Sequence, residues 1–145
     1  MLYTEMTNKA MRFSYEAHEG QYDKNGIPYI FHPYHLAEQM DDEASICVAL
    51  LHDVVEDTDY TIEDIAALGF SEEVVAAIAC LTKPEHMPYM DYIRKIKRNP
   101  LATKVKLADL DHNSDISRLP EISEKAMQRV RKYREAKEIL SEERL

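Results

Sequence analysis

Cysteine is scarce in this chain: Cys47 and Cys80 are the only two among 145 residues. Their separation does not match the closely spaced pairs that bind zinc, and both lie in apolar segments. This pattern predicts reduced thiols, as in a cytoplasmic protein. A chain of this length can bury a substantial core without disulfide bonds, so a bound metal would serve chemistry rather than folding.

Long apolar runs and an excess of basic residues are also missing. No stretch approaches the roughly 18 uninterrupted apolar residues of a membrane span, and residues 1–5 lack the basic and apolar regions of a signal peptide. The 18 basic residues are outnumbered by 27 acidic ones, and the net charge of −9 disfavours binding to nucleic acid polymers or anionic membranes. We therefore expect a cytoplasmic protein with a small-molecule partner, which can be anionic if a bound cation reverses the local field.

Glycine and proline interrupt the chain rarely, with three and six residues respectively. The segments between them repeat apolar residues at helical spacing, and strands are hard to find. The sequence therefore predicts an all-α fold with a single domain over residues 1–145. The expected helices cover residues 4–18, 33–40, 43–56, a short segment after a capping box at 61–64, and residues 71–81, 89–98, 101–113 and 123–140.

The segment from Leu50 to Thr58 contains the densest group of reactive side chains. On one continuous helix from Glu43 to Glu56, His52 and Glu56 would lie about 40° apart, with Asp53 about 100° and Asp57 about 140° from His52. A solvated helix face is the commoner explanation of such acidic patterns. If the pattern is functional instead, the imidazole and the carboxylates face one common space. Such a grouping indicates a metal ion and a group that activates water.

Two distant segments supply further donors of the same kind. His32 stands at the start of a helix, and Asp109 lies within an apolar helical run. With His52 and Asp53 they make four nitrogen or oxygen ligands, which suit one divalent ion such as Mn²⁺, Fe²⁺ or Zn²⁺. Lys106 and Asn113 lie about 60° and 40° from Asp109 around the same helix, so they are candidates to hold phosphate or ribose oxygens beside the ion.

These motifs resemble the HD phosphohydrolase superfamily, and in particular its Rel/SpoT-type hydrolase branch, which includes the small alarmone hydrolases. The resemblance extends from about residue 10 to residue 113 and implies a compact helical HD-domain fold. It rests on the segments Ala17–Gln21, Gly26–Ile30, Phe31–Pro33, Ala49–Thr58 and Lys106–Asp109, and on His112-Asn113.

The resemblance also implies the roles of individual residues. The metal, Mn²⁺, would be bound by His32, His52, Asp53 and Asp109. The acidic pair Glu56 and Asp57 would help to activate the water that removes the 3′-pyrophosphate from the alarmone ppGpp. The chemistry agrees, because a divalent ion lowers the pKa of bound water and a carboxylate can orient that water and accept its proton.

The segment after Gly20-Gln21 departs from the family pattern. Family members carry an Arg-Lys pair there that helps to hold the guanine nucleotide, whereas this chain has Tyr22-Asp23-Lys24-Asn25. Lys24 is the cation that remains, and Tyr29 is placed where it could stack on a base. This departure leaves the identity of the base open.

The other histidines and charges have simpler interpretations. His18 is expected to be structural, His86 to face solvent, and His35 to be a poorer ligand than His32, while His112 either packs against its own helix or lines the cleft. The extra acids Asp111 and Asp115 would repel a highly phosphorylated ligand if they face the pocket. A solvated face is the expected environment of Arg129, Arg131 and Lys132.

The leading functional prediction is metal-dependent hydrolysis of a nucleotide phosphate ester or pyrophosphate, with a ppGpp-like alarmone as the best single substrate. One alternative is another phosphorylated nucleotide, such as an adenine analogue of the alarmone. Another is a non-catalytic nucleotide-binding regulatory module that retains the same scaffold.

Overall fold

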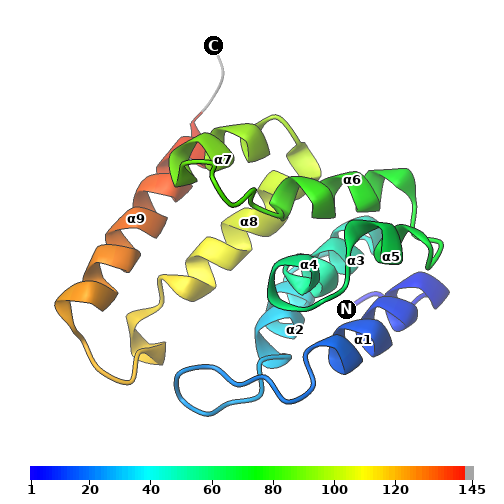
Figure 1. The fold of residues 1–145 in the computed structure, drawn as a ribbon, viewed down its shortest axis with the longest axis horizontal. Helices are drawn as coiled ribbons and strands as arrows, with labels where there is room; N and C mark the ends of the chain where they lie inside the picture. The colour runs from blue at the N-terminus through cyan, green and yellow to red at the C-terminus, as the bar shows by residue number, and fades with distance from the viewer. Residues whose placement is uncertain (143–145) are drawn as a thin grey trace.

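The computed structural model describes residues 1–142, and within that range the chain is helical (Figure 1). Apart from an isolated antiparallel bridge between Tyr22 and Pro28, these residues contain no β structure, which confirms the all-α prediction. None of the described helices is long and apolar enough to cross a membrane. The helices are α1 (Glu5–Ala17), α2 (Phe31–Glu38), α3 (Glu43–Leu51), α4 (Val54–Asp57), α5 (Ile62–Ala66), α6 (Glu72–Leu81), α7 (Tyr89–Lys97), α8 (Pro100–Asn113), the 3₁₀ turn η1 (Ile116–Arg118) and α9 (Glu124–Ser141).

Side-chain caps fix where several helices begin, because they satisfy backbone N–H groups that have no partner inside the helix. Asp42 caps α3 by accepting from the Ser45 backbone N–H at 2.8 Å. Asn99 caps α8, and Pro100 follows at a position that suits its fixed φ angle. The capping box predicted at 61–64 is confirmed at the start of α5.

Helix α3 lies at the centre of the hydrophobic core. Every residue from Ser45 to Leu51 is buried, and α1, α2, α6 and α8 all pack against this helix. Helix α9 packs on α7 and α8, and Figure 1 shows it on the side of the molecule opposite α1. Because α3 and α8 pack against each other, residues near their carboxyl-terminal ends lie close together although they are far apart in the sequence.

The predicted continuous helix from Glu43 to Glu56 is wrong, because the chain leaves the helical path at the His-Asp pair. Helix α3 ends at Leu51, and α4 begins only at Val54. Asp53 has φ −120° and ψ 8°, which is not helical. The His52 ring instead donates from Nδ1 to the carbonyl oxygen of Ala49 at 2.7 Å. The arrangement of the acidic residues therefore follows from this break and not from one helical surface.

Candidate metal centre

Three buried side chains from three separate helical segments lie close together. They are His32 on α2, His52 at the end of α3 and Asp109 on α8, and one ligand atom from each lies within 4.8 Å of the others. The Asp109 Oδ1 atom is 2.8 Å from His32 Nε2 and 3.6 Å from His52 Nε2. Two imidazoles and a carboxylate are common ligands of divalent transition metals.

The outer nitrogen of each imidazole is already used, so the inner nitrogens face the cluster. His52 Nδ1 donates to Ala49, as described above, and His32 Nδ1 is 2.7 Å from Nδ1 of His112. Such outer contacts set the tautomer and orientation of metal-binding histidines. Burial disfavours the charged form of His52, but Asp53 and Asp109 outweigh it and raise the pKa of His52 to about 9.

Asp53, the fourth predicted ligand, lies beside this group but does not share its close spacing. Its Oδ2 atom is 3.6 Å from His52 Nε2 and accepts a hydrogen bond from the Tyr29 hydroxyl. Its Oδ1 atom is 3.3 Å from His18 Nε2, within ion-pair range. Burial opposes ionisation of Asp53, but the neighbouring histidines hold the pKa of its carboxyl well below the usual range.

His18, expected to be structural, has a more specific place in the structure. The ring is buried, and its Nδ1 is 2.8 Å from Gln21 Oε1. Burial lowers the pKa of His18, but Asp53 and Gln21 raise it by more. The facing atoms His18 Nε2 and Asp53 Oδ1 are both buried without hydrogen-bond geometry to any partner. Unsatisfied buried polar atoms beside a His-His-Asp group fit a site that holds a cation.

Asp109 also contacts two residues that were predicted to bind substrate. Lys106 Nζ lies 2.9 Å from Asp109 Oδ2, and Asn113 Nδ2 donates to Asp109 Oδ1 at 3.0 Å. Burial opposes the charge on Asp109, yet Lys106 and the two histidines hold the pKa of this carboxyl well below its usual value. Lys106 therefore orients and neutralises a candidate ligand.

The acidic pair lies on α4, directly after the break. Glu56 accepts a hydrogen bond from the Lys83 backbone N–H at 2.5 Å. The carbonyl oxygen of Asp57 accepts from Gln21 at 2.9 Å. Burial, Asp53 and Glu56 raise the pKa of the Asp57 carboxyl, in that order of effect. Both side chains are exposed, so they border the buried cluster rather than belong to it.

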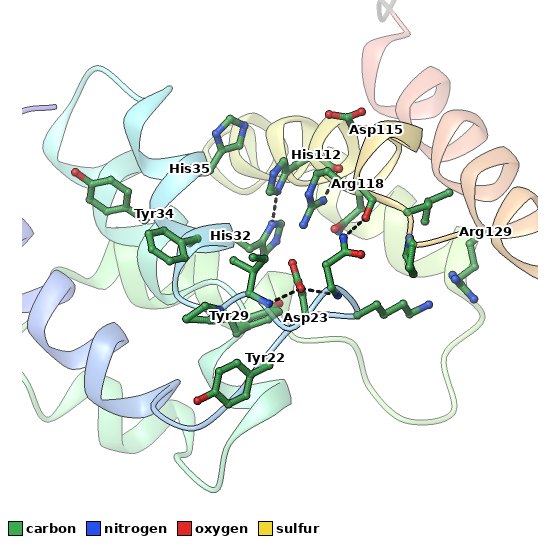
Figure 2. Close-up of a pocket in the computed structure, with 18 of the residues that line it drawn as sticks. Tyr22, Asp23, Tyr29, His32, Tyr34, His35, His112, Asp115, Arg118 and Arg129 are labelled. Atoms are coloured by element: carbon green, nitrogen blue, oxygen red, sulfur yellow. Dashed lines mark hydrogen bonds between the residues drawn. The ribbon is translucent and has the colours of Figure 1, made fainter. Parts of the chain in front are cut away.

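A cavity of about 820 Å³ opens beside His32, and Figure 2 shows its walls. Of the four residues predicted to contact substrate, Lys24, Tyr29 and Asn113 line this cavity, and Lys106 does not. His35 and His112 also line it, and their rings lie 4.2 Å apart between centroids. Burial and the neighbouring Arg118 lower the pKa of His112 to about 4, which keeps this ring neutral.

Two arginines in the cavity wall have no counterpart among the predicted contacts. Arg129, expected on a solvated face, lines the cavity and is only half-exposed, so that expectation is wrong for this residue. Arg118 also lines it and donates from Nη1 to the His112 carbonyl oxygen at 2.6 Å. Helical spacing on α9 could have suggested Arg129, because Ala126 and Val130 on the same helix are buried.

The extra acids do not form a repulsive wall. Asp111 does not line the cavity and pairs with Lys137 at 2.7 Å. Asp115 does line it, but its carboxylate accepts two hydrogen bonds from Ser117. Asp23 also turns back on its own loop, where Oδ1 accepts from the backbone N–H groups of Asn25 and Ile27 (Figure 2).

The fold and the buried cluster define a helical protein with a His-His-Asp centre, and comparison with known proteins identifies the family. Residues 10–137 match the family model of the HD domain, so the chain belongs to the HD domain family. Over 79 residues, or 52% of this chain, it is 46% identical to a probable guanosine-3′,5′-bis(diphosphate) 3′-pyrophosphohydrolase of Synechocystis sp.. Over 113 residues, or 68% of this chain, it is 34% identical to the bifunctional (p)ppGpp synthase/hydrolase SpoT of Escherichia coli K12.

These relatives are much longer proteins. The matched segments make up 10% of the Synechocystis protein and 16% of the Escherichia coli protein. Among solved structures, a metazoan ortholog of SpoT described as hydrolysing ppGpp superposes with a TM-score of 0.77 at 23% sequence identity. The match covers 97% of this chain and 88% of that one, which shows that the two share a fold.

Proposed function

We propose that this chain forms one HD-type phosphohydrolase unit that removes the 3′-pyrophosphate from ppGpp-like alarmones. The observation that carries the proposal is the buried group of His32, His52 and Asp109 at the edge of a cavity of about 820 Å³. That volume lies within the range typical of small-molecule sites. The names of the relatives supply the substrate class, since several of them are 3′-pyrophosphohydrolases of guanosine-3′,5′-bis(diphosphate).

The residues that would hold one divalent ion, for which Mn²⁺ is our first choice, are His32, His52, Asp53 and Asp109. When bound, such an ion polarises a phosphoryl oxygen and lowers the pKa of water. The chain's own residues then have separate tasks. Lys106 and Asn113 keep Asp109 aimed at the cluster, and Tyr29 and His18 do the same for Asp53.

Proton transfer belongs to Glu56 and Asp57 in this proposal. Both are carboxylates at the first turn after the His-Asp pair, and both are accessible to water. We assign the water-orienting role to Glu56 and an assisting role to Asp57. The raised pKa of Asp57 makes its carboxylate a better proton acceptor than an ordinary aspartate.

The cavity beside His32 is the proposed nucleotide site. Lys24, Arg118 and Arg129 bring three cations to its wall in a chain whose overall charge is −9. The wall also carries Asp23, Glu38 and Asp115, but Asp23 and Asp115 are bonded within their own turns, so the three cations remain available to phosphates. Tyr29 and Asn113 lie where they can contact the ribose or base. We place the activity in the cytoplasm, where the free thiols of Cys47 and Cys80 stay reduced.

The test is hydrolysis of a nucleotide panel by purified protein with Mn²⁺, Zn²⁺ or Mg²⁺, with product identification. We expect release of pyrophosphate and GDP from ppGpp, and loss of activity after chelation of the metal. Tight binding of ppGpp with no product over hours would instead support the regulatory module.

A second candidate substrate is the adenine analogue of the same alarmone. It is favoured by the loop after Gln21, where Asp23 is engaged in its own turn and Lys24 is the cation that faces the cavity. If this loop reads the base weakly, the two nucleotides should be hydrolysed at similar rates. A preference for ppGpp above about 100-fold, or roughly 2.7 kcal/mol, would show that other residues read the base.

A further inference from the structure

The histidine next to Asn113 makes an unusual contact with the candidate metal centre. His112 lies on α8, one helical turn after Asp109, and its Nδ1 is 2.7 Å from Nδ1 of His32. The two rings are nearly parallel, with an interplanar angle of 6° (Figure 2). The corresponding outer nitrogen of His52 faces a backbone carbonyl, whereas that of His32 faces a second imidazole.

Two nitrogens at this distance share one proton, so one ring donates and the other accepts. A neutral His32 that offers the Nε2 lone pair to a cation must carry its proton on Nδ1. It then donates to His112, and His112 must carry its own proton on Nε2. The orientation of His32 at the centre therefore depends on an acceptor at the Nδ1 position of residue 112.

The surroundings hold His112 in place for this task. Arg118 donates to the His112 carbonyl oxygen at 2.6 Å, and Arg118 in turn accepts at its own carbonyl from the Asn25 side chain at 2.5 Å. The His35 ring packs against the His112 ring. The backbone of His112 is thus linked through Arg118 to the loop after Gln21, and its ring packs against α2.

We propose that His112 is a positioning residue, which accepts a hydrogen bond from His32 Nδ1 and thereby directs His32 Nε2 to the divalent ion. This inference rests on the proposed metal centre but assigns a role to a residue outside the ligand set. The same contact joins the ion to the wall of the nucleotide cavity, because His112 belongs to both.

The test compares three variants by calorimetric titration with Mn²⁺ and Zn²⁺. His112→Leu removes the acceptor and should weaken metal binding about 10–100-fold, as losses of outer partners usually do. His112→Asn places an amide oxygen near the position of Nδ1, so most of the affinity should return. His86→Leu is the matched control: it makes the same exchange at an exposed histidine that does not line the cavity, so affinity should be unchanged.

Wild-type affinity in a folded His112→Leu protein would overturn the positioning role while leaving the metal centre intact. Failure of the wild type to bind any divalent ion would overturn the proposed centre and this role together. Imidazole nitrogen NMR of the wild type with Zn²⁺ gives a second answer if His112→Leu does not fold. We expect the proton of His32 on Nδ1 and that of His112 on Nε2, and a His112 proton on Nδ1 would contradict the proposal.

Discussion

Asp109 is the residue on which most contacts of the candidate centre converge. Its Oδ1 atom faces His32, His52 and Asn113, and its Oδ2 atom faces Lys106. A buried carboxylate in such a place has two tasks. In the proposed centre it would supply a ligand, and it balances the charge of a lysine ammonium that is largely withdrawn from water.

We predict that Asp109→Asn weakens both metal binding and the fold. The loss of metal affinity should exceed the roughly 10–100-fold that removal of an outer partner costs. The uncompensated Lys106 should lower the free energy of unfolding by about 3 kcal/mol. Metal titration and urea unfolding measure the two effects. Asp111→Asn, which removes an exposed acid two residues away, is the control and should change neither.

The acidic pair on α4 can be separated from the ligands by isosteric variants. Glu56→Gln keeps an oxygen that can accept from the Lys83 N–H, so the local fold should persist. Turnover should fall by about 10²–10⁴-fold with metal affinity nearly unchanged, because a positioned base is lost. The same measurements on Asp57→Asn rank the two residues. A metal-loaded Glu56→Gln enzyme with near-normal turnover would transfer the role to Asp57.

Single residues of the centre could be predicted where their type and segment were informative. His32, His52 and Asp109 do come together, as the three separated motifs indicated. Arg118 and the contact of His112 with His32 could not be predicted, because they depend on how η1 and α8 pack against the loop after Gln21. A lone arginine or histidine has no spacing pattern that reveals a partner about 80 residues away.

At the level of elements, the break between α3 and α4 arranges the candidate centre. Periodicity suggested one helix because residues 43–56 contain no glycine or proline and their apolar positions continue in phase. The chain breaks there because the His52 ring bonds to Ala49, and because Asp53 is held by Tyr29 and His18. Tertiary contacts overrode local helical preference, which is why the sequence could not reveal the boundary.

Gln21, in the loop after α1, connects that loop to the helix that follows the break. Its side-chain oxygen faces His18, and its amide donates to the Asp57 carbonyl at the end of α4. We predict that Gln21→Leu loosens α4 and lowers kcat about 10-fold through misplacement of the acidic pair, with a smaller effect on metal affinity. Hydrogen exchange of α4 amides and steady-state kinetics measure this. Gln39→Leu, which removes a bond only to its own helix, should be neutral.

At the scale of the whole molecule, the fold class and most helix positions followed from the sequence. Helices α6, α7, α8 and α9 lie within a few residues of their predicted bounds because caps and apolar periodicity agree there. The cavity could not be predicted, because its wall combines the loop after Gln21, α2, the end of α8 and α9. Its shape is a property of their packing, which no single segment encodes.

The buried charges also make the stability of the whole molecule depend on pH and metal. The pKa of His52 is raised from 6.5 to about 9, so its contribution to stability is full below about pH 6.5 and is lost as pH rises through 9. The pKa values of Asp53 and Asp109 are lowered from 3.8, so their contribution is present above that pH and is lost on acidification. His112, with its pKa lowered to about 4, also disfavours folding at acid pH.

In EDTA, the protein should therefore be most stable near pH 6 and should lose on the order of 1–3 kcal/mol between pH 6.5 and 9. Divalent metal should act in the opposite direction, because it competes with the proton on His52 and binds more tightly as pH rises. The difference in Tm between samples with Mn²⁺ and with EDTA should thus grow from pH 5.5 to 8.5. His52→Gln should remove most of the metal effect and most of the loss in EDTA, with the remainder of that loss due to His18, whose pKa is also raised. A Tm difference independent of pH in the wild type would place the ion away from His52.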